Sequence, residues 1–326
     1  MLDLDDDWVW DFWVVHDGSS FHCFFLKAPR SLGAPELRHL HASVGHAVSP
    51  DLRSWSRVAD ALEPQPEPAF DDLATWTGSV VRSDDGTWHM FTTGLSRDEG
   101  GAVQRIGVST SEDLMAWTRD PRPLLEADPR WYAVRGNGVP ETHWRDPWVL
   151  RDDEGRWHLL ATAMTRDGGT ASVAHATSPD LVSWSVGPPF AESRGRFRWA
   201  EVVSVQRVER RWVMLFSCLG AEMPADRGEA GGTWSLAVPS PSSWGEGGCI
   251  DLDGAVRLTD ERLYVGKVVQ LPGGDWRFLA FRNQDAEGTF AGGLIDPMAV
   301  AWRPDHAGLR LVGVREEETR PQLDSV

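Results

Sequence analysis

A phrase of small residues followed by Asp-Leu-x-x-Trp recurs along this chain and constrains its fold more than any other feature. Three copies are complete and a fourth is degraded. The copies end at Trp55, Trp117, Trp184 and Trp244, roughly 60 to 70 residues apart. Self-similarity at a regular period is the sequence signature of a repeat architecture. Each repeat should therefore contain the same set of structural elements.

Each repeat also contains a turn that is followed by an aromatic residue and a short apolar run. The turns lie at Asp17-Gly18, Asp85-Gly86, Glu154-Gly155, Glu209-Arg210 and Gly273-Gly274. Asp-Gly between strand-like runs is a strong hairpin signal. Another apolar run precedes each turn, at residues 10–15, 78–82, 147–151, 202–207 and 265–271. The pattern predicts antiparallel strands along the whole chain.

Five such repeats predict an all-β fold, namely a five-bladed β-propeller with four antiparallel strands per blade. We expect a single domain over residues 1–315, in which residues 290–302 complete the fifth blade. The charged segment 316–326 is expected to be a C-terminal tail.

The charge balance of the chain disfavours some classes of binding partner. The chain has 49 acidic and 32 basic residues, a net charge of −17, so nucleic acid and anionic membranes are poor candidates. The acidic start Asp3–Asp7 lacks the order of a signal peptide and is expected to be solvated. We expect a cytoplasmic protein, with a mature part of a secreted precursor as the alternative. The oligomeric state is left open.

The cysteines and histidines do not indicate a metal site. Cys23, Cys218 and Cys249 are isolated, so they form neither a metal-binding spacing nor a disulfide framework. His39, His41 and His46 lie close together without an acidic or cysteine partner, which favours a polar strand. We therefore expect no metal and no other cofactor.

One stretch, Arg145-Asp146-Pro147, places an arginine and a carboxylate side by side before an apolar run. Pro147 fixes its own φ and disfavours the helical region for Asp146, which we expect to be extended. Trp148-Val149-Leu150 is typical of a buried strand. Taken alone, this pattern fits an ordinary Arg–Asp pair at the end of a strand as well as it fits a functional site.

The repeat pattern favours the functional site over the ordinary structural pair. When residues are counted back from the hairpin aromatic of each blade, the same position is filled by Asp11, Thr77, Asp146, Glu201 and Val265, the last next to Tyr264. Three of these five are carboxylates. Carboxylates crowded at one end of a channel cost stability through repulsion and desolvation. A functional trio is therefore favoured over a structural one.

Three carboxylates at the end of a narrow channel suit the cleavage of a glycosidic bond, which needs one acid and one base or nucleophile. Neighbouring carboxylates raise the pKa that the acid requires, and Arg145 can hold one of them ionised. Tryptophans beside the trio would wall the pocket: Trp10, Trp13, Trp76, Trp144 and Trp199. Those at repeat positions are expected in the core: Trp55, Trp88, Trp117, Trp157, Trp184, Trp212 and Trp276.

The chain resembles the five-bladed propeller glycoside hydrolases, most of all the fructan-active clan of families 32 and 68, to which family 43 is related. Residues 9–13, Val-Trp-Asp-Phe-Trp, are similar to the nucleophile motif of family 68. Residues 44–55 resemble the Trp-Gly-His-Ala stretch of family 32, which ends in Asp-Leu-x-x-Trp. Residues 76–79 and 145–147 are similar to segments of both families.

The resemblance implies roles for the trio. Asp11 would be the nucleophile, Asp146 would bind fructosyl hydroxyls and stabilise the transition state, and Glu201 would be the general acid/base. The substrate-binding residues would be Trp10, Trp13, Trp76, Ser79, Arg145, Trp199 and Tyr264.

We expect a retaining β-fructofuranosidase that acts on a small carbohydrate, either sucrose or a short fructo-oligosaccharide, by hydrolysis or by fructosyl transfer. Two alternatives stay open. One is an inverting arabinofuranosidase or xylosidase like those of family 43. The other is a non-catalytic propeller that binds sugars.

Overall fold

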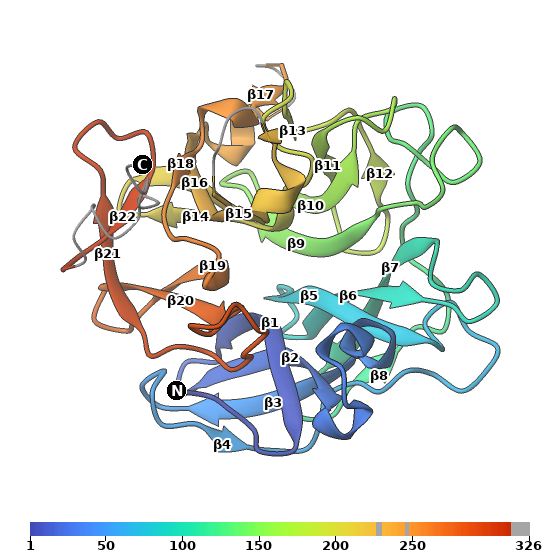
Figure 1. Cartoon of the computed structure of the whole chain (residues 1–326), viewed down its shortest axis with the longest axis horizontal. Coiled ribbons are helices and arrows are strands. Elements are labelled where there is room, and N and C mark those ends of the chain that lie inside the picture. Colours follow the sequence, from blue (N-terminus) through green and yellow to red (C-terminus); the bar gives the residue numbers. More distant parts are fainter. Residues whose placement is uncertain (226–229, 245–247, 314–326) are drawn as a thin grey trace.

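Five sheets stand as blades around a central axis in the computed structural model, which describes residues 1–225, 230–244 and 248–313 (Figure 1). The predicted all-β, five-bladed propeller is confirmed. The helices within these ranges are short 3-10 turns: η1 (Arg30–Leu32), η2 (Pro35–His41), η3 (Gly220–Glu222), η5 (Pro241–Ser243) and η6 (Leu252–Gly254). The predicted tail 316–326 lies outside the described residues.

In four blades the strands follow chain order from the axis to the rim. Blade 1 has β1 (Asp7–His16), β2 (Phe21–Pro29), β3 (Ser43–Ser49) and β4 (Ser56–Arg57), and blade 2 has β5 (Ala74–Arg82), β6 (Trp88–Leu95), β7 (Gln104–Ser111) and β8 (Thr118–Arg119). Blade 4 has β14 (Glu201–Val208), β15 (Arg211–Cys218), β16 (Gly232–Val238) and β18 (Val256–Arg257), and blade 5 has β19 (Leu263–Gln270), β20 (Trp276–Arg282), β21 (Met298–Trp302) and β22 (Leu309–Leu311).

Blade 3 differs at its rim. Its inner strands are β9 (Arg145–Arg151), β10 (Trp157–Met164) and β11 (Ala171–Ser178), and its edge is divided between β12 (Ser185–Val186) and β13 (Ala191–Glu192). Strand β17 (Ile250–Asp251), which precedes β18 in the chain, pairs in parallel with β13. This extra pairing joins the rim of blade 3 to the segment that leads into the last strand of blade 4.

The repeated Asp-Leu-x-x-Trp phrase is the turn that leaves the third strand of a blade. In the second copy the carboxylate of Asp113 accepts hydrogen bonds from two following backbone N–H groups. The indole of Trp117 donates to the carbonyl of Leu114. The leucine is buried with a positive φ of 63° to 65° in the complete copies, Leu52, Leu114 and Leu181. The short Asp side chain satisfies the turn's backbone donors, which explains the recurrence.

The tryptophans at repeat positions pack between neighbouring blades. Trp117 of blade 2 lies edge-on to Phe24 of blade 1, with ring centroids 5.6 Å apart, and Trp184 of blade 3 lies edge-on to Phe91 of blade 2 at 5.8 Å. The predicted core set is buried or packed against the apolar clusters: Trp55, Trp88, Trp117, Trp157, Trp184, Trp212 and Trp276. Their predicted core placement is confirmed.

The N-terminal segment closes the ring against blade 5. The expected solvated terminus is confirmed for Asp3, Asp5 and Asp6, which are exposed, and was wrong for Asp7. Leu2 is 4% exposed and forms a β-bridge with Leu294, whose N–H donates to the Leu2 carbonyl at 2.8 Å. Asp3 pairs with Arg282 of β20. Asp7 already belongs to β1 and is 8% exposed.

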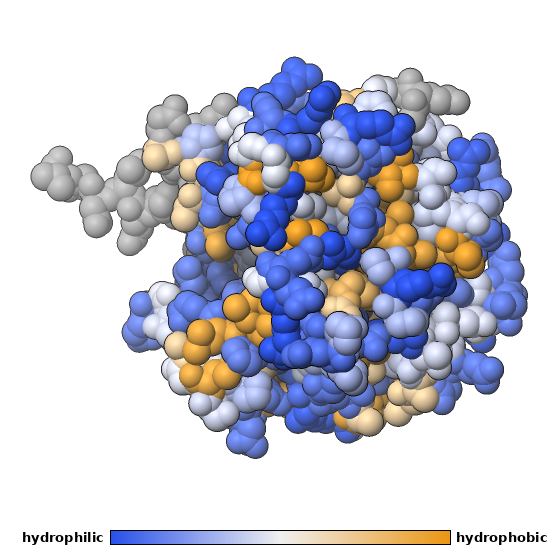
Figure 2. Space-filling model, turned by 90° about the vertical axis from the view of Figure 1, so that its right-hand side faces the viewer, coloured by the Kyte–Doolittle hydropathy of each residue, from blue (hydrophilic) through white to orange (hydrophobic). Residues whose placement is uncertain are grey.

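The surface accords with the acidic composition. The side of the molecule in Figure 2 is mainly hydrophilic, with apolar residues in separate areas. No helix in the described part of the chain combines the length and the apolar character that crossing a bilayer requires.

Leu2→Ala should destabilise the protein by about 2–3 kcal/mol, because it leaves a cavity where the ring closes. The free energy of unfolding in urea measures this effect. Leu37→Ala is the matched control: Leu37 is 46% exposed on η2, and its truncation should cost less than about 0.5 kcal/mol. Equal effects of the two changes would mean that the N-terminal segment does not contribute to ring closure.

Candidate active site

A β-bulge interrupts the innermost strand of every blade at the same point. The pairing register breaks directly after Trp10, Trp76, Arg145, Glu201 and Tyr264. The residue that follows each break is Asp11, Thr77, Asp146, Val202 or Val265. Bulges re-aim side chains and are frequent beside active sites. Here they direct residues from five strands toward one end of the channel.

This register corrects one expectation. Asp11 and Asp146 occupy equivalent bulge positions, whereas Glu201 stands one residue earlier, where blade 3 has Arg145 and blade 5 has Tyr264. Counting back from the hairpin aromatic misplaced Glu201 because the β14–β15 hairpin turns over only two residues, with Glu209 at φ 57°. The trio still converges, but from two different positions of the repeat.

Hydroxyl groups hold three of the bulges. In each case the bulged N–H donates to a Ser or Thr on the second strand of the preceding blade: Asp146 to Thr93 (2.9 Å), Val202 to Thr162 (3.3 Å) and Val265 to Ser217 (3.0 Å). The same three residues have positive φ, at 58°, 52° and 52°. The expected extended conformation of Asp146 was therefore wrong. Pro147 excludes the right-handed helical region, and the Thr93 hydroxyl selects the left-handed one.

A cavity of about 360 Å³ lies where the bulges converge. Eight of the ten predicted site residues line it: Trp10, Asp11, Trp76, Arg145, Asp146, Trp199, Glu201 and Tyr264. The remaining lining residues are Leu26, Arg38, His39, Thr77, Gln104, Glu141, His143, Val202, Leu219, Phe281 and Asn283.

Two predicted site residues do not line the cavity, and their assignment is corrected. Trp13 is 1% exposed and stacks on Phe24 in the core, because it follows the bulge and belongs to the next layer of side chains. Ser79 is 2% exposed and its Oγ accepts the N–H of Val149, which joins blades 2 and 3. Trp144, also expected in the wall, is fully buried against Tyr132.

Asp11 lies in the bulge of β1 and accepts a hydrogen bond from the hydroxyl of Thr77 at 2.5 Å. Burial, aided by the charges of Asp146 and Glu201, raises the pKa of Asp11 to about 7. Thr77 and Arg38 oppose this rise because both stabilise the ionised form.

Asp146 is the most enclosed carboxylate of the trio. It is 4% exposed, and its Oδ2 accepts the Thr162 hydroxyl at 2.9 Å and the N–H of Val202 at 3.3 Å. Arg145 Nε lies 3.4 Å from the same oxygen. Burial raises the pKa of Asp146, and the charge of Arg145 opposes that rise. These contacts hold Asp146 in one orientation.

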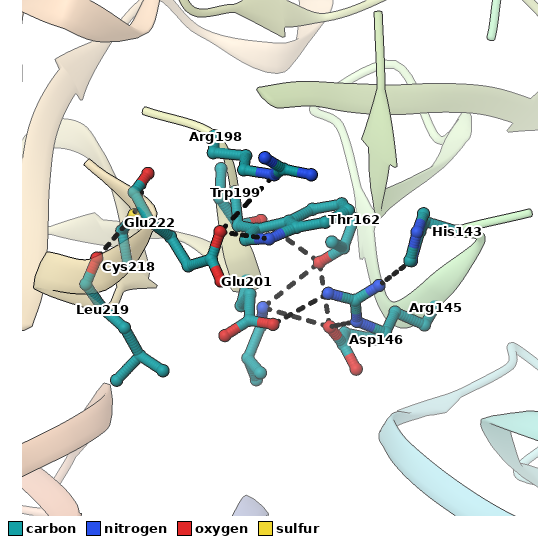
Figure 3. A network of polar contacts seen from close by, with 12 residues as sticks. His143, Arg145, Asp146, Thr162, Arg198, Trp199, Glu201, Cys218, Leu219 and Glu222 are labelled. Carbon is teal, nitrogen blue, oxygen red and sulfur yellow. Dashed lines mark hydrogen bonds and ion pairs between the residues drawn. The ribbon is translucent and has the colours of Figure 1, made fainter. Parts of the chain in front are cut away.

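Glu201 is held by two donors from neighbouring blades. Arg145 Nη2 donates to its Oε1 at 2.8 Å (Figure 3). The hydroxyl of Tyr264 donates to its Oε2 at 2.7 Å. Burial and the charge of Glu201 raise the pKa of Tyr264, so its hydroxyl stays a donor. The side chain of Glu201 is 25% exposed, against 3% for that of Asp146.

Arg145 connects two of the carboxylates. It is 8% exposed, and its Nη1 lies 2.9 Å from His143 Nδ1 and 3.3 Å from Gln104 Oε1. Burial and the Arg145 charge lower the pKa of His143 to about 3, so this imidazole is neutral and can accept the hydrogen bond. The guanidinium also lies 5.1 Å from the ring of Trp199. Arg145 is thus fixed on every side.

The sequence interpretation missed one wall of the cavity. His39 and His41, expected on a polar strand, lie instead in η2, which brings Arg38 and His39 to the mouth. His46, expected with them, does lie on a strand, β3. The Arg38 guanidinium stacks on Phe290 at 3.8 Å and lies 5.5 Å from the Trp10 ring. Pro35 at the first position of η2 was the available signal for a helical turn. Nothing in the spacing indicated that this insertion folds over blade 1.

The sequence also matches the model of a known protein family. The family model described as the glycosyl hydrolases family 32 N-terminal domain matches residues 13–233. This range begins just after Asp11 and includes Asp146 and Glu201.

Curated relatives match about half of the chain. An insoluble isoenzyme of beta-fructofuranosidase from Arabidopsis thaliana is 29% identical over 183 residues, which cover 55% of this chain and 31% of that protein. Sucrose-6-phosphate hydrolase from Bacillus subtilis is 28% identical over 177 residues, covering 54% and 33%. The chain therefore spans about a third of the length of these relatives.

Solved structures share the fold. The inulosucrase from Halalkalicoccus jeotgali, bound to kestose, aligns with a TM-score of 0.74 at 20% identity and covers 98% of this chain and 90% of that one. A family 32 beta-fructofuranosidase from Bombyx mori aligns with a TM-score of 0.71 at 18% identity, covering 93% and 62%. Since the family match extends over well more than half of the sequence, this chain belongs to glycosyl hydrolase family 32.

Proposed function

We propose that this protein is a retaining β-fructofuranosidase-type enzyme that removes a fructosyl unit from sucrose or a short fructo-oligosaccharide and passes it to water or to a sugar acceptor. One observation carries the proposal: three carboxylates and one buried arginine converge in a cavity of about 360 Å³. That volume suits a small ligand such as a terminal sugar. The family and the activities named for its relatives support the same class of substrate.

The environments of the carboxylates suggest their roles. Asp146 is buried and saturated with donors, so it suits a fixed group that binds hydroxyls and stabilises positive charge in the transition state. Asp11 has Thr77 as its short-range donor and suits the nucleophile, because one oxygen is positioned and the ring of the sugar can approach the other. The side chain of Glu201 is 25% exposed, which suits the exchange of protons with a leaving group and water.

In the proposed reaction Glu201 donates a proton to the glycosidic oxygen while Asp11 attacks the anomeric carbon of the fructosyl unit. The leaving sugar departs and a covalent fructosyl ester on Asp11 remains. Glu201 then removes a proton from water or an acceptor hydroxyl as its oxygen attacks the anomeric carbon, which breaks the ester bond and releases the Asp11 carboxylate. The indole rings of Trp10, Trp76 and Trp199 give the cavity flat apolar walls for the sugar rings.

The alternatives are less favoured. An inverting arabinofuranosidase or xylosidase and a sugar-binding propeller would fit the fold, but membership of family 32 does not point to either. Release of sugar from sucrose and inulin-type oligosaccharides, against nitrophenyl arabinofuranoside and xyloside, separates the three possibilities. The cytoplasmic location stays a prediction.

Asp11→Asn should reduce fructose release from sucrose by about four orders of magnitude, because the amide keeps the shape but cannot form the ester.

The same change, Asp11→Asn, should stabilise the fold above pH 7. The folded pKa of Asp11 is raised, so its ionised form costs stability that the amide avoids, and this advantage should shrink as the pH falls toward 4. Melting temperatures at pH 8 and pH 4 test the second part, and wild-type turnover by the variant would exclude Asp11 as nucleophile.

The pH profile of kcat/KM should lose activity below about pH 7, because the raised pKa of Asp11 lets the free enzyme take up a proton on the nucleophile there. Initial rates at low substrate concentration between pH 4 and pH 9 measure this limb. A limb that lies near pH 4 instead would mean that Asp11 ionises like an ordinary aspartate in the working enzyme.

Glu201→Gln should lower kcat/KM for sucrose by about 10²–10⁴-fold, because the leaving glucose needs a proton. Fructosyl fluoride should be affected far less, since fluoride departs unprotonated, and azide should restore turnover by attacking the fructosyl ester. Glu222→Gln is the control: Glu222 accepts the indole N–H of Trp199 from behind the wall. If both substrates suffer equally and azide has no effect, Glu141 at the cavity rim is the next candidate acid.

A further inference from the structure

A lysine lies inside the channel beneath the carboxylates. Lys267 belongs to β19 of blade 5 and is 3% exposed. Its Nζ donates to the carbonyl of Val202 in blade 4 at 2.9 Å and lies 5.1 Å from the Trp148 ring of blade 3. A side chain from blade 5 that contacts blades 3 and 4 must extend across the channel. Its register position, just past the bulge, is equivalent to those of Trp148 and Ser204.

Such a cation needs compensation. Removing an ammonium group from water costs several kcal/mol unless charges or hydrogen bonds replace the solvent. Burial lowers the pKa of Lys267 to about 7, while the charges of Asp146 and Asp11 favour its protonated form. The two carboxylates and the lysine therefore stabilise one another's charges across the layer that separates them.

The contact with Val202 has a geometric consequence as well. Val202 has a φ of 52°, a strained value for a β-branched residue. Its N–H donates to Asp146, its carbonyl accepts from Lys267, and the residue before it is Glu201. Strained backbone persists where its surroundings over-determine it. Asp146 thus holds the peptide between Glu201 and Val202, and the lysine holds the next peptide, between Val202 and Val203.

We propose that Lys267 is a positioning residue of the active site, which clamps the Val202 carbonyl and supplies positive charge to Asp11 and Asp146 from below. The inference rests on the proposed function for its kinetic part only. Lys267 is then the third cation near the three carboxylates, together with Arg145 and Arg38.

Several charged groups face this lysine and its carboxylates. Asp11 extends from β1, Asp146 and Arg145 from β9, and Glu201 from β14. Arg38 approaches Asp11 from η2. Arg145 and Arg38 remain when Lys267 is neutralised, so Asp11 should lose only part of its electrostatic support. The acid limb of kcat/KM should then move toward higher pH by about one unit.

The kinetic experiment compares Lys267→Met with Ser204→Ala, the neutral control from the equivalent position of blade 4. We expect Lys267→Met to lower kcat/KM for sucrose at least tenfold at pH 7 and to recover part of it at pH 8.5. Ser204→Ala should keep the wild-type profile. A Lys267→Met profile that is merely scaled down, with an unmoved acid limb, would overturn the electrostatic role. Lys267→Gln, which keeps a donor, provides the same test if the methionine variant folds poorly.

A second experiment needs no substrate. The melting temperature gained on Asp11→Asn is measured against pH with Lys267 present and with Lys267→Met. The gain should level off at a higher pH when the lysine is removed, and the gain at pH 8 should increase. If this shift occurs in a protein that cleaves no fructoside, the proposed function fails while the coupling stands. If the two curves coincide, Lys267 does not act on Asp11.

Discussion

The hydrogen bond from a bulged N–H to a hydroxyl on the preceding blade is the interaction on which the site depends. It recurs between blades 2 and 3, 3 and 4, and 4 and 5, each time at a residue with positive φ. Where the preceding blade instead carries Leu26 or Phe281, the bulged residues Thr77 and Asp11 do not adopt positive φ. At these three junctions a Ser or Thr thus fixes the bulge of the next blade, so the placement of Asp146 and of the backbone beside Glu201 and Tyr264 depends on contacts between blades.

The cations that balance the carboxylates of the site also come from different parts of the propeller. Arg145 lies between Asp146 and Glu201, Arg38 approaches Asp11 from an insertion, and Lys267 lies below. Each carboxylate has a different set of donors, so three chemically similar groups acquire different properties. Such assignment by environment is how one site can hold an acid and a nucleophile together.

Much of the fold could be read from local signals. The Asp-Leu-x-x-Trp turn is a short-range motif whose hydrogen bonds lie within a few residues, and the hairpins are set by their turn residues. Strand number, blade count and the core tryptophans followed from their repetition. Asp11, Asp146 and Arg145 were identified because motif and repeat position agreed, and the cavity contains all of them.

The features of the site that the sequence could not predict depend on how the blades are placed relative to one another. The repeat position of Glu201 was miscounted because the β14–β15 hairpin is short, and Glu201 lines the cavity from the position before the bulge. Trp13 and Ser79 turned into the core because a bulge shifts the alternation of inward and outward side chains. Arg38 and Lys267 became part of the site only when an insertion folded over blade 1 and a channel closed around five strands. Local hydrogen bonding determines the elements, whereas burial and charge within the channel arise only when all five blades meet.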